Sequence, residues 1–190
     1  LGANKFYYFE PNLKIEILKS KKIKEKYFFK MYLELVSNYG KLMSFNDFYY
    51  KIINDTHEID YNKDECLDFV ISNSVLEHIP KDEIGILLSN IYGVMKKNSI
   101  FIHVVDHSPH STIDTDLMKF YIGSKDKNFE GLNLLRKSEV QLCIENSGFI
   151  EIMGYTYMSQ EIDGAKIDKS WEIFSKDDIE SRVVFYIGKK

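Results

Sequence analysis

The sequence predicts an α/β protein with a doubly wound, mostly parallel sheet and an antiparallel strand at its C-terminal edge. Short apolar runs alternate with longer stretches of helical spacing, and turn-forming residues separate them. One of these runs is apolar almost throughout, as in the middle of a parallel sheet. With 190 residues the chain is long enough for one sizeable core, so we expect residues 1–190 to form a single domain.

The first predicted elements are a strand and a long helix. Residues 5–9 (KFYYF) are rich in strand-forming side chains and are followed by a proline, so they predict a strand with Glu10 at its carboxyl end. Apolar residues recur at helical spacing between residues 12 and 36, and Gly40 marks the end of this helix. Residues 45–53 fit a short helix or a strand, because their aromatic residues match both periods.

The middle of the chain predicts the centre of the sheet. Residues 68–72 (DFVIS) form an apolar run between polar residues, as expected of a central strand that is buried on both faces. Pro80 opens a helix with apolar residues at helical spacing up to about residue 96. Residues 99–105 (SIFIHVV) predict the next strand, and a loop over residues 106–110 follows it.

The C-terminal part predicts one more helix and two strands. Residues 138–146 indicate a short helix that ends before Gly148, and residues 149–157 and 182–187 indicate strands. The stretch around Trp171 is interpreted as a connection. Parallel strands of such a sheet present their carboxyl ends along one rim, and we expect ligands to bind there.

Composition narrows the classes of partner. The chain has 25 Lys and Arg against 29 Asp and Glu, so no basic surface is expected for nucleic acid. No apolar stretch approaches the roughly 20 residues that span a bilayer, so no membrane partner is expected. Cys66 and Cys143 have neither CxxC spacing nor a companion histidine cluster. This pattern predicts no metal site and no disulfide, and it fits a cytoplasmic protein.

Three stretches place polar residues where the predicted sheet binds ligands. After the first strand, the carboxylate of Glu10 can accept hydrogen bonds from both hydroxyls of a ribose, or it can simply be solvated. Asp55 lies in residues 54–58, which we interpret as a loop, and its carboxylate can accept a hydrogen bond from an adenine amino group. An ordinary loop is the simpler interpretation there. Residues 72–79 (SNSVLEHI) directly follow the central strand and are the most specific signal in the chain.

These stretches resemble class I S-adenosylmethionine-dependent methyltransferases. The resemblance rests on the run LDFVISNSVLEHIP, the helix leading to VMKKNSIFIHVVDH, the KFYYFEP strand and the SEVQLCIENSGF helix, and it extends from residue 2 to residue 189. It implies a Rossmann-like fold and S-adenosylmethionine as cofactor, with a small-molecule or carbohydrate acceptor. The segments IHVVDHSPH and LNLLRKSEVQ resemble bacterial members that modify surface polysaccharides.

The resemblance also assigns cofactor contacts. It implies that Glu10 holds the ribose, that Asp55 and Thr56 hold the adenine, and that Asn73 and Val75 hold the methionine end. The glycine-rich loop of the family follows its first strand, and here only Leu1 precedes Gly2. We therefore expect the printed chain to miss the first strand of the sheet, and the native protein to have more residues before Leu1.

Methyl transfer from a sulfonium requires that the acceptor is positioned and that water is excluded, and it needs no metal. A hydroxyl acceptor also needs a base, and a histidine is well suited near neutral pH. His103, Asp106, His107 and His110 lie at or just beyond a strand end on the expected rim. We predict His107 as the base, oriented by Asp106, with His103 as a further candidate. Alternatively, His103 is a satisfied sheet residue and His110 is solvated.

Two other functions remain open. A non-catalytic methyltransferase-like module would scaffold a partner or regulate an active homologue. The missing glycine-rich loop supports this function, whereas Glu10, Asp55 and Asn73 oppose it. A nicotinamide-dependent reductase would also need an acid after its second strand, but the VLEHI run argues against that class.

Overall fold

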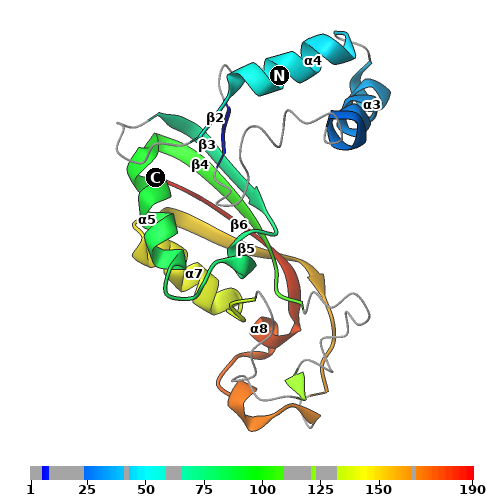
Figure 1. The fold of residues 1–190 in the computed structure, drawn as a ribbon. Helices are drawn as coiled ribbons and strands as arrows, with labels where there is room; N and C mark the ends of the chain where they lie inside the picture. Colours follow the sequence, from blue (N-terminus) through cyan, green and yellow to red (C-terminus); the bar gives the residue numbers. More distant parts are fainter. Residues whose placement is uncertain are drawn as a thin grey trace. The chain divides into compact units, whose positions relative to one another are not determined.

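The computed structural model describes residues 6–8, 24–40, 43–58, 66–108, 121–122, 132–163 and 166–190 (Figure 1). The chain divides into two compact units, Leu1–Asp60 and Tyr61–Lys190. Each unit is described by itself below. The sequence predicts that both units belong to a single domain, and this stays a prediction.

The N-terminal unit contains a helical pair and a small parallel sheet. In chain order its elements are β1 (Phe6–Tyr8), η1 (Lys24–Phe28), α3 (Phe29–Tyr39), α4 (Phe45–Asp55) and β2 (Thr56–Glu58). β1 pairs with β2 in parallel, so the strand predicted over residues 5–9 is confirmed. The predicted end of the long helix is also confirmed, because α3 stops at Gly40, whose φ of 75° favours glycine.

Aromatic contacts between α3 and α4 explain why the ambiguous segment is a helix. Phe45 and Tyr49 are four residues apart and therefore lie on one face of α4. The rings of Phe29 and Tyr32 lie 5.0 and 5.6 Å from the Phe45 ring, centre to centre. The Lys24 ammonium lies 4.4 Å from the centre of the Tyr49 ring and adds a cation–π contact. In a strand, Phe45 and Tyr49 would be spaced differently, and these contacts with Phe29, Tyr32 and Lys24 would be lost.

The C-terminal unit is built on a four-stranded sheet. Its elements in chain order are β3 (Leu67–Asn73), η2 (Leu76–His78), α5 (Ile84–Val94), β4 (Met95–Asp106), α7 (Lys137–Asn146), β5 (Ile150–Ser159), η4 (Lys169–Trp171), α8 (Lys176–Glu180) and β6 (Ser181–Lys189). The strand order is β3-β4-β6-β5. β3 is parallel to β4, and β6 is antiparallel to both of its neighbours. The α/β class and the antiparallel last strand are confirmed, but β6 lies inside the sheet and β5 forms the edge.

Helices α5 and α7 cover one face of this sheet (Figure 1). Alternate residues of β4, such as Phe101 and Val105, are buried there with Leu88 of α5 and Ile144 of α7. Gly188 of β6 lies against Phe101, because an added Cβ would come within 2.6 Å of the ring. The close approach of β6 to the core thus requires glycine at this position.

The opposite face of the sheet carries exposed apolar side chains. On β3, Phe69 is 47% exposed and Ile71 is 66% exposed, and β3 forms an edge of the four-stranded sheet. The prediction that residues 68–72 form a central strand buried on both faces is therefore wrong for this sheet. An apolar run shows that a strand suits an interior, but it does not show what packs on either face.

A second, smaller core surrounds Trp171. Its other members are Tyr121, Ile162 and Ile179, and the rings of Tyr121 and Trp171 meet edge to face at 4.9 Å. The short elements η4 and α8 supply Trp171 and Ile179. The stretch that the sequence indicated as a simple connection is thus a packing centre.

Candidate functional site

The carboxyl ends of β3 and β4 lie next to each other, with Asn73 opposite Val104. Ser74 follows β3 with a φ of 52°, a left-handed conformation that is uncommon for a residue with a Cβ. Its amide donates to the Val104 carbonyl at 2.9 Å, which fixes the turn against β4. Strained residues cluster at functional sites, and strand ends are where open α/β sheets bind ligands. This edge is therefore the candidate site.

Two residues that were predicted to contact the cofactor lie at this edge. Asn73 is the last residue of β3 and is exposed, and Val75 is half-buried as the residue before η2. An exposed amide beside a half-buried apolar side chain suits a ligand with polar and apolar parts. Their assignment to the methionine end stays a prediction.

The segment of residues 132–136, called the strap below, holds the turn that follows β3. The Asn133 side-chain amide donates to the carbonyls of Leu76 at 2.6 Å and Ile79 at 2.8 Å. Its backbone amide donates to the Glu77 carbonyl at 2.8 Å. Leu134 has a φ of 58°, a second strained position at this edge. The segment LNLLRKSEVQ contains Asn133 but assigned it no role, because its partners are more than 50 residues away.

A small recess opens between η2, the end of β4 and the strap. It is lined by Glu77, Asp106, His107, Ser108, Leu132, Asn133, Leu134, Leu135 and Arg136. Glu77 is buried, and its Oε1 accepts a hydrogen bond from the Asp106 amide at 3.4 Å. Asp106 is half-buried, and its Oδ1 accepts hydrogen bonds from the amide and the hydroxyl of Ser108. Two carboxylates therefore border the recess and favour ligand groups that donate hydrogen bonds.

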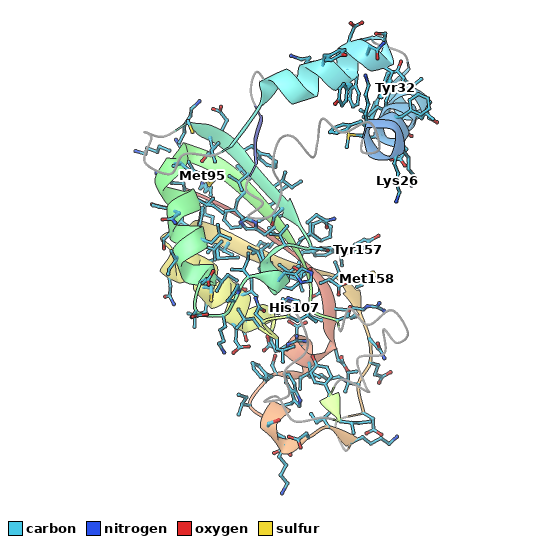
Figure 2. The ribbon with its side chains drawn as sticks, viewed as in Figure 1. Lys26, Tyr32, Met95, His107, Tyr157 and Met158 are labelled. Atoms are coloured by element: carbon cyan, nitrogen blue, oxygen red, sulfur yellow. The ribbon has the colours of Figure 1, made fainter. Side chains whose placement is uncertain are left out.

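His107, the predicted base, is buried with both ring nitrogens engaged (Figure 2). Nδ1 lies 2.8 Å from the Leu135 carbonyl oxygen, and Nε2 lies 2.9 Å from the Tyr186 hydroxyl. A carbonyl only accepts, so Nδ1 carries the hydrogen that it donates to Leu135. The Tyr186 hydroxyl has one hydrogen, and both His107 Nε2 at 2.9 Å and the Lys137 carbonyl at 3.1 Å lie within reach of it. Burial, together with the nearby Arg136 guanidinium, lowers the pKa of His107 to about 3. A base role for His107 therefore requires that Tyr186 first releases Nε2.

His103 is also buried, on the face of β4 that the helices cover. It shares this face with Phe101, on whose ring it stacks at 5.0 Å between centres. Its Nδ1 lies 2.7 Å from the Ser72 hydroxyl of the neighbouring strand. Burial lowers the pKa of His103 to about 4. His103 is not among the residues that line the recess, whereas Asp106 and His107 of the predicted catalytic set both line it.

Arg136 ties the end of β4 to the second core. Its guanidinium donates to the His107 carbonyl at 3.0 Å and to the Tyr121 hydroxyl at 2.7 Å. It also lies 5.7 Å from the centre of the Trp171 ring. The side chain is buried, and Arg136 is also one of the residues that line the recess.

The remaining predicted contacts belong to the N-terminal unit. Glu10 lies outside the described residues, and so does His110. Asp55 ends α4 and Thr56 begins β2, so the stretch that was predicted as a loop is a helix end joined directly to a strand. The ring contacts with η1 and α3 involve Phe45, Phe48 and Tyr49, and the helix continues beyond them to Asp55. The roles of Glu10, Asp55 and Thr56 toward a cofactor stay predictions.

Cysteines, clustered metal ligands and long apolar helices provide no second candidate site. Cys66 and Cys143 are free thiols. In the described ranges, no group of three or more His, Cys, Asp or Glu side chains is arranged to hold a metal ion. Across those same ranges, none of the helices combines the length and the apolar character that crossing a membrane requires.

Comparisons with known proteins find similar solved structures only. No protein-family model matches the chain, and no curated protein does. A SAM-dependent methyltransferase from Archaeoglobus fulgidus is 18% identical with a TM-score of 0.45, over 93% of this chain and 95% of that one. A Haemonchus contortus phosphoethanolamine N-methyltransferase 2, in complex with phosphomonomethylethanolamine and S-adenosylhomocysteine, is 14% identical with a TM-score of 0.45, over 83% of this chain.

Human N-acetylserotonin methyltransferase in complex with SAM is 16% identical with a TM-score of 0.41, over 72% of this chain. The chain spans 46% of the Haemonchus protein and 33% of the human protein, less than half of each. No role of a residue in this chain follows from likeness at this level.

Proposed function

We propose that the chain belongs to a methyltransferase that moves a methyl group from S-adenosylmethionine to a small-molecule or carbohydrate acceptor. The observation that carries the proposal is the edge where β3 and β4 end, with the strained turn at Ser74. The residues of this edge are the SNSVLEHI run, on which the resemblance to class I methyltransferases chiefly rests. Bacterial surface polysaccharide synthesis is the setting that the sequence resemblance suggests.

The donor groups at this edge fit such a cofactor. Asn73 presents an exposed amide that can donate to a carboxylate and accept from an ammonium group. Val75, half-buried beside it, offers an apolar surface for the thioether carbons. S-adenosylmethionine, when bound, supplies the electrophilic methyl group, and the chain's own task is to orient the acceptor and to exclude water.

We propose that the reactive hydroxyl or amine of the methyl acceptor reaches the recess, which has room for little more than a water-sized group. Glu77 and Asp106 border it with carboxylates, while the guanidinium of Arg136 is directed to the His107 carbonyl and Tyr121. A hydroxyl or amine therefore meets acceptors there, whereas an anionic group meets like charge. We keep His107 as the proposed base and Asp106 as its proposed partner. Asp106 is the carboxylate that borders the recess.

Calorimetric titration tests the cofactor part of this proposal. We expect the native full-length protein to bind S-adenosylmethionine and S-adenosylhomocysteine, and Asn73→Ala in that protein to weaken both affinities roughly tenfold through loss of charge-assisted hydrogen bonds. Asn90→Ala is the matched control, because Asn90 is an exposed asparagine on α5. A folded, full-length wild-type protein that binds neither compound would contradict the proposal.

A methyltransferase-like scaffold without catalysis is the second candidate. The observation that favours it is the burial of His107, whose two ring nitrogens already have partners. A chain that binds cofactor but transfers no methyl group to any hydroxyl or amine acceptor would support the scaffold. Methyl transfer to one such acceptor, detected by mass spectrometry, would exclude the scaffold.

A further inference from the structure

The strap makes hydrogen bonds to both turns that border the recess. On the β3 side, Asn133 contacts three carbonyls of residues 76–79 through its side chain and its backbone amide. On the β4 side, the Leu135 carbonyl lies 2.8 Å from His107 Nδ1, and Arg136 donates to the His107 carbonyl at 3.0 Å. One five-residue segment thus fixes the cofactor side and the acceptor side of the proposed site together.

Asn133 supplies donors that the η2 turn lacks. η2 has three residues, so it satisfies few of its own carbonyls. The Asn133 side chain occupies the carbonyls of Leu76 and Ile79, and its Oδ1 accepts from the Leu135 amide at 3.0 Å. These groups are partly buried, so loss of the amide costs hydrogen bonds: the Leu76 carbonyl keeps only the long bond from the Ile79 amide at 3.3 Å, and the Ile79 carbonyl loses the Asn133 donor. The turn and the strap are therefore held as one piece by this side chain.

The backbone conformation on both sides of the recess agrees with segments that are held tightly in place. Leu134, directly after Asn133, and Ser74, directly after β3, both have positive φ. Such conformations persist only where the surroundings determine them. Val75 stands between Ser74 and η2, so the position of the predicted cofactor contacts depends on how η2 is held.

We infer that Asn133 is a positioning residue for the cofactor, acting through η2 on Ser74 and Val75. The inference rests on the proposed function. Misplacing binding groups by up to about an ångström can cost about a hundredfold in function. Loss of the Asn133 hydrogen bonds is therefore expected to lower the affinity for the cofactor.

The test compares three variants of the native full-length protein by calorimetry with S-adenosylmethionine and S-adenosylhomocysteine. Asn133→Ala removes every side-chain bond, and Asn133→Asp keeps the acceptor but loses both donors to Leu76 and Ile79. Ile144→Val is the control, because Ile144 is buried on α7 and its truncation lowers stability without touching the strap. Amide NMR shifts of Ser74 and Val75 in the ligand-free protein give a second readout.

We expect both Asn133 variants to weaken the two affinities roughly tenfold or more and to shift the Ser74 and Val75 amides, because the turn loses its donors. Ile144→Val should leave the affinities within about twofold and these amides in place. Wild-type affinity in folded Asn133→Ala would overturn the inference alone. A full-length wild-type protein that binds neither compound would overturn the proposed function and, with it, this inference.

Discussion

At the scale of single residues, burial decides what the two central histidines are able to do. His103 and His107 are both almost fully buried, and neither has a carboxylate as its hydrogen-bond partner. Placing a charged imidazolium there costs solvation that a serine, a tyrosine or a carbonyl does not replace. Both rings are therefore neutral in the folded protein, with pKa values of about 4 and about 3.

This neutrality predicts a loss of stability in mild acid. In the unfolded chain both histidines titrate near 6.5, so between pH 6.5 and about 4 the unfolded state binds more protons than the folded state. The contribution of the two neutral histidines to the free energy of unfolding is then complete above pH 6.5, and it falls as the pH drops through this window. At pH 4.5 we expect a loss of roughly 2 to 3 kcal/mol per histidine, measured by urea unfolding with Trp171 fluorescence.

His103→Gln provides the control for this pH dependence. Glutamine keeps a hydrogen-bonding group for Ser72 but does not titrate. The variant should therefore show about half of the pH dependence of the wild type. A wild-type unfolding free energy that is equal at pH 7 and pH 4.5 would show that these histidines are not held neutral by burial.

At the scale of elements, the sequence predicted regular segments well where their pattern is local. The strand over residues 99–105 corresponds to β4 and the helix over residues 138–146 to α7, because their apolar spacing is unbroken. The helix α4 stayed ambiguous, since its identity depends on rings of α3. The stretch at residues 54–58 was predicted as a loop, but α4 runs to Asp55 and β2 begins at Thr56.

The candidate site, like the regular segments, could be predicted from the sequence only where the signal is local. Asn73 and Val75 were predicted as cofactor contacts because they lie at the end of a strand or just after it, which is a local signal, and their roles stay predictions. The partners of Asn133 lie 54 and 57 residues away, and Tyr186 lies 79 residues from His107. Contacts at such separations depend on strand order, which spacing along the chain does not reveal.

The junction of α7 and α8 depends on one buried carboxylate. Asp178 Oδ1 accepts from the Ser138 amide at 2.7 Å in the first turn of α7, and Oδ2 accepts from the Ser175 hydroxyl at 2.8 Å. Burial by itself raises the pKa of Asp178, but the hydrogen bonds from Ser138 and Ser175 outweigh it and lower the pKa. The carboxylate thus fixes the start of α7, directly after the strap.

We expect Asp178→Ala to lower the free energy of unfolding by about 2 kcal/mol, because it removes a cap from α7 and leaves the Ser138 amide without this acceptor. Asp177→Ala is the neighbouring control. Its carboxylate pairs with Lys137 at 2.7 Å, but the side chain is 66% exposed, so about 0.5 kcal/mol or less is expected. Equal losses in the two variants, measured by urea unfolding, would contradict the capping role.

At the scale of the whole molecule, the described residues of the C-terminal unit build a sheet and two cores of their own. Among these residues the sheet pairs strands within 67–189, and both hydrophobic cores are formed by residues of the same unit. Arg136 connects these two cores through His107 and Tyr121. Tyr157 and Met158 of β5, with Phe69 and Ile71 of β3, leave much apolar surface exposed (Figure 2). Exposed apolar surface of this kind promotes association.

We therefore expect residues 61–190 alone to fold and to unfold cooperatively at nearly the urea midpoint of the full chain. The reason is that, among the residues that the structure describes, removing residues 1–60 takes away no strand pairing of the four-stranded sheet and no member of either core. Trp171 fluorescence is the measurement, since it reports the second core, and it is best made at low protein concentration because of the exposed apolar side chains. Val184→Ala, at a fully buried position of β6, should lower the midpoint of both chains alike. A fragment without a cooperative transition, while the full chain has one, would show that the N-terminal unit is needed to complete the fold.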